Sequence, residues 1–275
     1  MTTDVNRRVL PGFALSLGYT MFYLSLLVLI PILAGVIKAS TLSFAAFWGA
    51  VSTDRAIAAY ELTLGVSVVS AAIDIVLGLL VAWVLVRYTF PLKRLFDALV
   101  DLPFALPTAV AGLVYSDLYV EQGWLGRFLV PLGIQGSYSR LGIVLVLVFI
   151  GFPFVVRTLQ PVIENLESDI EEAAACLGAN RWQTVTRVIL PALYPAMITS
   201  FALAFARSLG EYGSVVFISG NMPFRTEIAP VLIVARLEEF AYGEATAIAV
   251  VLLAMSLVTL FFINLLQRWS TQVHG

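Results

Sequence analysis

Long apolar stretches separated by short polar segments dominate the pattern of this chain. A helix that crosses a membrane needs about 20 mostly apolar residues. Six stretches meet that requirement, at residues 15–37, 61–86, 99–116, 141–159, 196–218 and 246–266. The pattern predicts an all-α, multi-pass membrane protein in which residues 1–275 form a single transmembrane domain with about six helices.

The first stretch follows two arginines, as the apolar core of a signal peptide does. Its apolar run is longer than the roughly 7–15 residues of a signal sequence, so we expect it to remain as a membrane helix. Lys and Arg in short cytoplasmic loops set the orientation of such proteins. With the N-terminus inside, the inner segments hold nine of these residues and the outer loops hold six. The inner ones are Arg7, Arg8, Arg87, Lys93, Arg94, Arg157, Arg181, Arg187 and Arg268, and the outer ones are Lys38, Arg55, Arg127, Arg140, Arg225 and Arg236. We therefore expect both termini in the cytoplasm.

Composition agrees with a membrane protein. Hydrophobic residues make up 60% of the chain and charged residues 12%, against roughly 45–50% and 25% in soluble domains. The net charge of −2 gives no reason to expect nucleic-acid binding. A lone cysteine, Cys176, and a lone histidine, His274, leave no disulfide, metal site or catalytic residue to predict.

The third stretch has an unusual interior. It contains Pro103 and Pro107, four residues apart, and each removes a backbone donor from a helix. A broken helix in a membrane is tolerated where protein or a water-filled cavity covers the freed groups. The prolines therefore favour a position beside a translocation path, although a simple kink would also explain them.

The inner segment at about 157–193 is the longest predicted cytoplasmic loop. Its apolar residues recur at steps of three and four, as on one face of a helix: Ile163, Leu166, Ile170, Ala174 and Leu177. Gly178 suits the left-handed position that ends such a helix. Asn180 is expected to cap a second short helix through Val188, and Pro191 is expected to mark entry to the next span.

The same segment resembles the EAA signature of ABC importer permeases, EAA-x3-G-x9-I-x-L-P. The matching residues are Glu172, Ala173, Ala174, Gly178, Val188, Leu190 and Pro191, with valine at 188 as the one departure. The resemblance implies a type I ABC importer permease fold, in which this loop forms a coupling helix seated in a cleft of an ATP-hydrolysing subunit. The chain has no G-x4-G-K-[ST] phosphate loop, so ATP and Mg would bind to a separate partner, and we expect this chain to be no enzyme and to hold no cofactor.

Further segments resemble the sulfate and molybdate permeases. Residues 205–221 resemble both groups, while residues 226–233 and 101–112 look closest to the sulfate branch. The resemblance implies an inner-membrane importer of sulfate or thiosulfate with a CysW-like second permease, a CysA-like ATPase dimer and a periplasmic binding protein. Molybdate or tungstate is the alternative substrate.

The fifth stretch carries two charges, Arg207 and Glu211. They are four residues apart and so share one face of a helix. Lipid exposure of either would be costly, so both are expected to face the protein interior. Two interpretations stay open: a salt bridge that fixes helix packing, or, with Ser214, Pro103 and Pro107, a gate beside the translocation path.

Three small residues in the fifth stretch favour close approach to a second permease, or packing within the chain. They are Gly210, Gly213 and Ser214. Asp74 lies in the middle of the second stretch, where we expect it to face the interior with a polar partner or water. Charges within spans also fit an ion-coupled secondary transporter, but we find no internal repeat of the kind typical of those proteins. A membrane-embedded enzyme would need a nucleophile or histidine cluster that the sequence lacks.

Overall fold

The computed structural model describes residues 13–274, and within them helices and turns alternate with no β-strand. In chain order the elements are α1 (Phe13–Leu24), η1 (Ser25–Leu29), α2 (Ile30–Ser40), α3 (Phe44–Val51), α4 (Asp54–Arg87), α5 (Lys93–Val100), α6 (Leu102–Ala105), α7 (Thr108–Tyr119), α8 (Gly126–Leu129), η2 (Val130–Leu132), α9 (Arg140–Glu164), α10 (Ser168–Cys176), α11 (Arg181–Thr184), η3 (Val185–Ile189), α12 (Leu190–Leu209), α13 (Val215–Ile218), α14 (Ala229–Glu238) and α15 (Tyr242–His274). Among these residues, five helical segments are long and apolar enough to cross a membrane: Leu15–Ser40, Asp54–Arg87, Arg140–Glu164, Arg181–Leu209 and Tyr242–Leu265. The predicted all-α, multi-pass architecture is confirmed.

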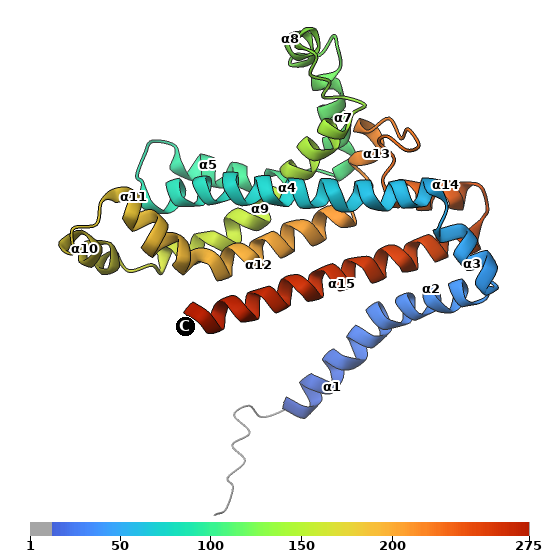
Figure 1. Ribbon diagram of the computed structural model, residues 1–275, viewed down its shortest axis with the longest axis horizontal. Helices are drawn as coiled ribbons and strands as arrows, with labels where there is room; N and C mark the ends of the chain where they lie inside the picture. The colour runs from blue at the N-terminus through green and yellow to red at the C-terminus, as the bar shows by residue number, and fades with distance from the viewer. Residues whose placement is uncertain (1–12, 275) are drawn as a thin grey trace, which may run out of the picture.

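The centre of the molecule is a bundle of α4, α9 and α12, with α15 beside α12 (Figure 1). Its core is aliphatic and aromatic, and Leu159, Leu193 and Phe205 are fully buried there. The first span behaves differently. Its α2 end contacts α15, while α1 extends away from the bundle (Figure 1), so most of its apolar surface is uncovered in the isolated chain.

The third predicted span, 99–116, is not one helix. It is divided among α5, α6 and α7, and α7 leaves the bundle at a steep angle (Figure 1). The break follows from Pro107, because a residue that precedes proline is driven out of the helical region. Leu106 accordingly has φ −87° and ψ 131°, and Pro107 sits at the N-cap of α7. Pro107 therefore breaks the helix and does more than kink it, whereas Pro103 lies in the first turn of α6. Pro153, by contrast, lies inside the uninterrupted α9.

The fifth predicted span, 196–218, also ends early. Helix α12 stops at Leu209, a turn covers residues 210–214, and the single-turn helix α13 follows. Two glycines in the turn weaken helix propagation.

The start of this span is also different from the prediction. No separate short helix runs from Asn180 to Val188, because α11, η3 and α12 join into one continuous rod from Arg181 to Leu209. Pro191 lies near the start of α12 and does not interrupt the rod. Proline lacks an N–H and crowds the carbonyl four residues earlier, and the widened η3 turn directly before it accommodates both effects. The same arrangement recurs where η1 precedes α2, which has proline in its first turn.

Candidate functional site

The hairpin between α9 and the Arg181–Leu209 rod carries the first half of the EAA-like sequence. Helix α10 ends as predicted, with Gly178 in the left-handed region at φ 84°. The Gly178 N–H donates to the Ala175 carbonyl (2.9 Å) and the Ala179 N–H to the Ala174 carbonyl (3.0 Å). This pair of bonds is a Schellman motif, which satisfies the carbonyls that a helix end leaves free.

The second arm of the hairpin starts with a capping box. The Asn180 side chain accepts from the Gln183 N–H, and the Gln183 side chain accepts from the Asn180 N–H, each at 2.9 Å. The predicted N-cap at Asn180 is therefore confirmed. Together the Schellman motif and the capping box fix a tight turn of defined geometry between the two arms.

The first arm is not one continuous amphipathic helix, as its periodicity predicts. The helix is interrupted at residues 165–167, so Ile163 belongs to α9 and Ile170 belongs to α10. An arginine from α4 holds this break: Arg87 donates to the Leu166 carbonyl at 3.1 Å and pairs with Glu171 at 3.0 Å. Periodicity cannot reveal this contact, because its partners are about 80 positions apart in the sequence.

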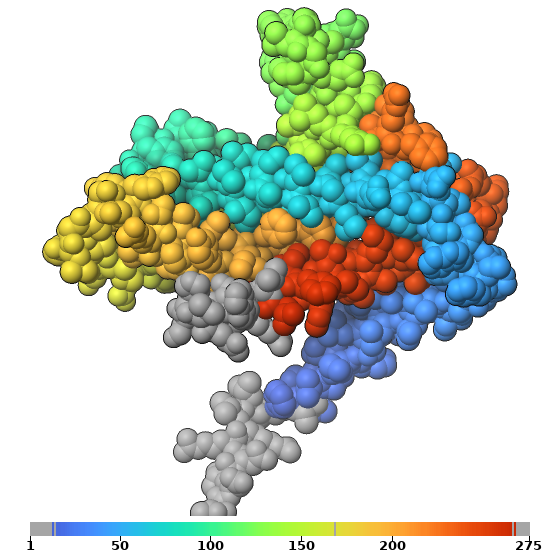
Figure 2. Space-filling model, viewed as in Figure 1, coloured from blue at the N-terminus to red at the C-terminus, as the bar shows by residue number. Residues whose placement is uncertain are grey.

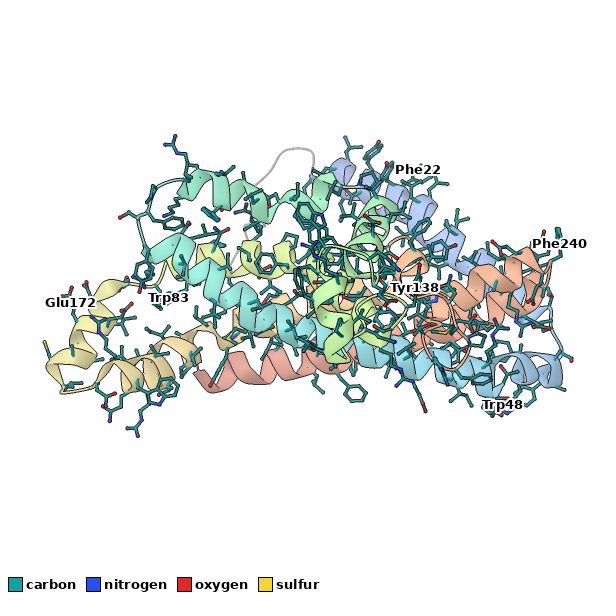
Figure 3. The ribbon with its side chains drawn as sticks, turned by 90° about the horizontal axis from the view of Figure 1, so that it is seen from above. Phe22, Trp48, Trp83, Tyr138, Glu172 and Phe240 are labelled. Atoms are coloured by element: carbon teal, nitrogen blue, oxygen red, sulfur yellow. The ribbon has the colours of Figure 1, made fainter. Side chains whose placement is uncertain are left out.

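The tip of the hairpin presents apolar side chains to its surroundings. Leu177 is 89% exposed and Trp182 is 74% exposed. Glu172 lies at the same extreme end of the molecule (Figure 3), and its side chain and that of Ala173 are exposed. The tip therefore offers apolar surface that is available for contact with a partner.

The second half of the EAA-like sequence has a different environment. Val188 belongs to η3, and Leu190 and Pro191 begin α12. All three are half-buried, so they join the hairpin to the bundle while the glutamate and alanines form its outer surface. The residues between the long helices are 165–180, and the outer parts of the predicted 157–193 loop continue the helices.

The turn after α12 gathers the predicted gate residues. Arg207 Nη1 donates to Glu211 Oε2 at 2.6 Å, and the Glu211 side chain is 3% exposed. Glu211 Oε1 accepts from both the N–H and the hydroxyl of Ser214, each at 2.9 Å. The expected ion pair is confirmed. Glu211 is buried, as expected, whereas the Arg207 side chain is only partly buried. Ser214 enters as a direct partner of the glutamate, which the sequence spacing alone did not assign.

This turn packs against the broken third stretch. A side chain at Gly213 would collide with the Thr108 hydroxyl, and a side chain at Gly112 would collide with the Ser214 backbone. The structure thus brings Pro107, the N-cap of α7, close to the Arg207–Glu211 turn. Pro103 lies in α6, whose Phe104 ring meets Phe154 of α9 edge-on at 5.1 Å.

Only one of the three small residues that were expected to contact a second permease is free to do so. Gly213 and Ser214 are already occupied by α7 of the same chain. Gly210 is exposed, and a methyl group added to its Cα would meet no atom within 4 Å. Of the three, Gly210 alone is open to a partner among the described residues.

Asp74 faces the interior, as expected, and no described residue is its polar partner. It is fully buried, and neither carboxyl oxygen has a hydrogen-bond partner among the described residues. It lies against Gly151 of α9, where a side chain would collide with Asp74 Oδ2, and near Ala204 of α12.

An ion-pair cluster beneath the third stretch was not predicted. Arg157 donates to Asp101 at 2.6 and 2.8 Å and to Asp97 at 2.6 Å, and Gln160 also donates to Asp97 at 3.1 Å. The hydrogen bonds from Arg157 and then Gln160 hold the pKa of Asp97 below its ordinary value. The spacing of two acids four residues apart on one helix face is the signal that could have found it. The cluster anchors α5 to α9.

Comparison with known proteins gives consistent relatives. Residues 74–272 match the family model described as the binding-protein-dependent transport system inner membrane component. The sulfate transport system permease protein CysT of Salmonella typhimurium is 49% identical over 271 residues, 98% of each chain. That of Escherichia coli is 48% identical over 98% of each chain. That of Synechococcus elongatus is 50% identical over 94% of this chain and 92% of the relative.

Solved structures share the fold. A chain of a bacterial alginate ABC transporter, solved with an alginate-bound periplasmic protein, superposes with a TM-score of 0.71 over 93% of each chain at 20% identity. A chain of the MetNI methionine ABC transporter gives 0.55 at 16% identity, over 80% of this chain and 95% of that one. At such low sequence identities, the structural similarity supports a shared fold only.

Proposed function

Because the chain belongs to the family of binding-protein-dependent transport system inner membrane components, we propose that it is a permease subunit of an ATP-driven importer for sulfate, with thiosulfate as a second substrate. The observation that carries the substrate is the end-to-end identity of 48–50% to three CysT permeases. The protein then resides in the inner membrane with both termini in the cytoplasm, and the transport path forms between this chain and a CysW-like second permease.

In this proposal the chain forms part of the transport path and does not catalyse ATP hydrolysis. ATP and Mg bind to a CysA-like ATPase dimer, and a periplasmic binding protein delivers the oxyanion. The exposed hairpin is the contact with the ATPase: Leu177 and Trp182 offer apolar surface for burial, and Glu172 offers a charge at its edge. The Schellman motif at Gly178 and the capping box at Asn180 stiffen this contact, so that it moves as a unit with the ATPase.

The gate is the turn of Arg207, Glu211 and Ser214 packed on the Pro107 end of α7. Both broken helices meet there, and a break allows one segment to shift while its neighbour stays in place. Arg207 is 32% exposed while bound to Glu211, so its guanidinium presents a cation at the surface. Its pairing with Glu211 weakens the field that an anion would meet, which favours a gating role over a binding role.

Reconstituted transport tests the substrate and the energy source. The chain, its second permease, the ATPase and the binding protein are placed in liposomes, and uptake of labelled sulfate is measured. We expect uptake that requires ATP, is reduced by excess thiosulfate and is unaffected by excess molybdate. Competition by molybdate at equal concentration would redirect the proposal to a molybdate or tungstate importer. Uptake that survives without ATP and collapses with an uncoupler would replace the proposal with ion-coupled transport.

Substitution at Gly178 tests the hairpin. Gly178 and Gly133 both have positive φ, 84° and 80°, and neither has an atom near the side-chain position. Aspartate at either site costs roughly 1 kcal/mol of local backbone strain. We expect Gly178→Asp to reduce recovery of the ATPase with the permease and to lower uptake severalfold, with normal membrane insertion. Gly133→Asp is the matched control and should behave as wild type. Equal uptake in the two variants would contradict a coupling role.

A further inference from the structure

A pocket of about 430 Å³ lies between α4, α9 and the segment before α14, at the opposite end of the bundle from the EAA-like hairpin. Its walls carry two opposite charges, Glu61 of α4 and Arg140 of α9, with Phe224 at the rim. Gly65 forms part of its floor, and no atom lies within 4 Å of a side-chain position there.

Neither charge is neutralised within the described part of the chain. Glu61 makes no hydrogen bond or ion pair with a described residue. Arg140 uses Nε to donate to the Arg225 carbonyl at 2.9 Å, which leaves both terminal nitrogens of its guanidinium free of described partners. The two groups are therefore available to a ligand that carries both a cation and an anion.

The pocket continues along α4 as an apolar groove. A second hollow of about 440 Å³ is lined by Val68, Val69, Ala72, Ile73, Val76 and Leu77, and it shares Val69 with the first. All six of these residues are exposed, and α4 lies along an open face of the molecule in the space-filling view (Figure 2). The combined site is thus charged at one end and hydrocarbon-like over the rest of its length.

The position of the site along α4 matches the layers of a membrane. Helix α4 has 34 residues, which correspond to about 51 Å at 1.5 Å per residue. A hydrocarbon layer of about 30 Å centred on it spans roughly residues 61–81. Glu61 then lies at the boundary with the headgroups, and the groove from Val68 to Leu77 lies beside the acyl chains.

We propose that this site binds one phospholipid with an ammonium-bearing headgroup, such as phosphatidylethanolamine. The phosphate pairs with the Arg140 guanidinium, the ammonium pairs with the Glu61 carboxylate, and one acyl chain lies along the groove. Lipid fits this groove better than a second permease does. Membrane helices that pack closely use small residues, whereas this stripe is mostly branched aliphatic residues with one alanine.

The test measures lipid retention by the detergent-purified full-length chain with native mass spectrometry. The chain is exposed to dioleoyl-phosphatidylethanolamine or dioleoyl-phosphatidylglycerol before measurement. We expect one molecule of the ethanolamine lipid to be retained in preference to the glycerol lipid. Gly65→Leu, whose Cβ would meet no atom within 4 Å, extends a side chain into the pocket and should abolish retention. Gly35→Leu in α2 is the matched control, because that position is equally open, and it should leave retention unchanged.

Two charge variants identify the headgroup contacts. Glu61→Gln should remove the preference for the ethanolamine lipid, and Arg140→Gln should weaken retention of both lipids. Retention by Gly65→Leu equal to that of the wild type would overturn the proposal, as would equal retention of the two lipids by the unaltered chain. Disulfide crosslinking of Val69→Cys to another permease chain in intact membranes would assign the groove to a protein partner and also overturn it.

Discussion

Two buried carboxyl groups, Asp74 and Glu211, have opposite surroundings. Asp74 is fully buried and has no hydrogen-bond partner among the described residues. Glu211 is 3% exposed and accepts three hydrogen bonds, one from Arg207 and two from Ser214.

The difference comes from where each residue lies along its helix. Glu211 follows the end of α12 and precedes α13, and the first residues of a helix have N–H groups with no partner inside it. The Ser214 N–H is such a group, so the break itself provides a donor. Asp74 lies in the middle of the unbroken α4, where backbone N–H groups are already used, and its neighbours Gly151 and Ala204 have no polar side chain. The polar network therefore lies at the broken helix, whereas Asp74 in the unbroken helix has no partner among the described residues.

The largest expected effect separates the two acids directly. Glu211→Leu strands the Arg207 guanidinium and the Ser214 N–H, and removing one member of a fully buried ion pair costs about 3–5 kcal/mol. Because Arg207 is 32% exposed, we expect a loss nearer to about 2–3 kcal/mol. Asp74→Leu strands no partner and should lower the unfolding midpoint far less. The unfolding midpoints of the two variants are measured by thermal unfolding in the same detergent. Equal decreases in the midpoint would show that the two carboxyl groups do not differ in this way.

Gly151→Ala tests how tightly Asp74 is enclosed. The added methyl group meets Asp74 Oδ2, and overpacking of this kind typically costs about 1–3 kcal/mol. The double variant Gly151→Ala with Asp74→Ala should recover most of that loss, which a double-mutant cycle reports as a coupling energy. Gly65→Ala is the control, since its side-chain position is open. Absence of coupling would mean that the two residues do not touch.

Ser214→Ala refines the other side of the comparison. It removes the hydroxyl bond to Glu211 Oε1 and keeps the backbone bond, so the loss should be about 1 kcal/mol. Ser256→Ala in α15 removes a hydroxyl that bonds only to the Leu252 carbonyl of its own helix, and it should cost less. The same unfolding measurement compares them, and a larger effect at Ser256 would contradict the role given to Ser214.

The smallest effect is expected for Asp74→Asn. The amide has the shape of the carboxyl group and is neutral, and no cationic partner loses a bond, so the change in stability should stay within about 1 kcal/mol. Sulfate uptake should be largely kept. A normal amount of folded protein with no uptake would instead give Asp74 a direct part in transport.

Local signals in the sequence predicted the features that depend on neighbouring residues. The helix end at Gly178, the cap at Asn180 and the pairing of Arg207 with Glu211 all involve partners within five positions. The break at residues 165–167 was missed because Arg87 of α4 holds it. Long-range contacts of this kind leave no trace in periodicity.

The sequence also did not predict where the helices would be interrupted. Pro107 and Pro191 have the same local chemistry, yet a break in the helix precedes Pro107 and none precedes Pro191. The η3 turn before Pro191 absorbs the missing bond, whereas Leu106 takes an extended conformation. Which solution a proline adopts depends on the elements packed around it.

The rod from Arg181 to Leu209 can act as a lever. Its 29 residues correspond to a length of about 43 Å, with the hairpin at one end and Arg207 near the other. A tilt of about 5° around its midpoint moves each end by about 2 Å in opposite directions. The turn at residues 210–214 moves with that end, and its Gly213 lies against the Thr108 side chain of α7. A tilt of this size would therefore displace the turn relative to α7. A tilt that leaves the packed centre of the bundle almost in place would therefore carry a movement of the hairpin to the turn that we propose as the gate.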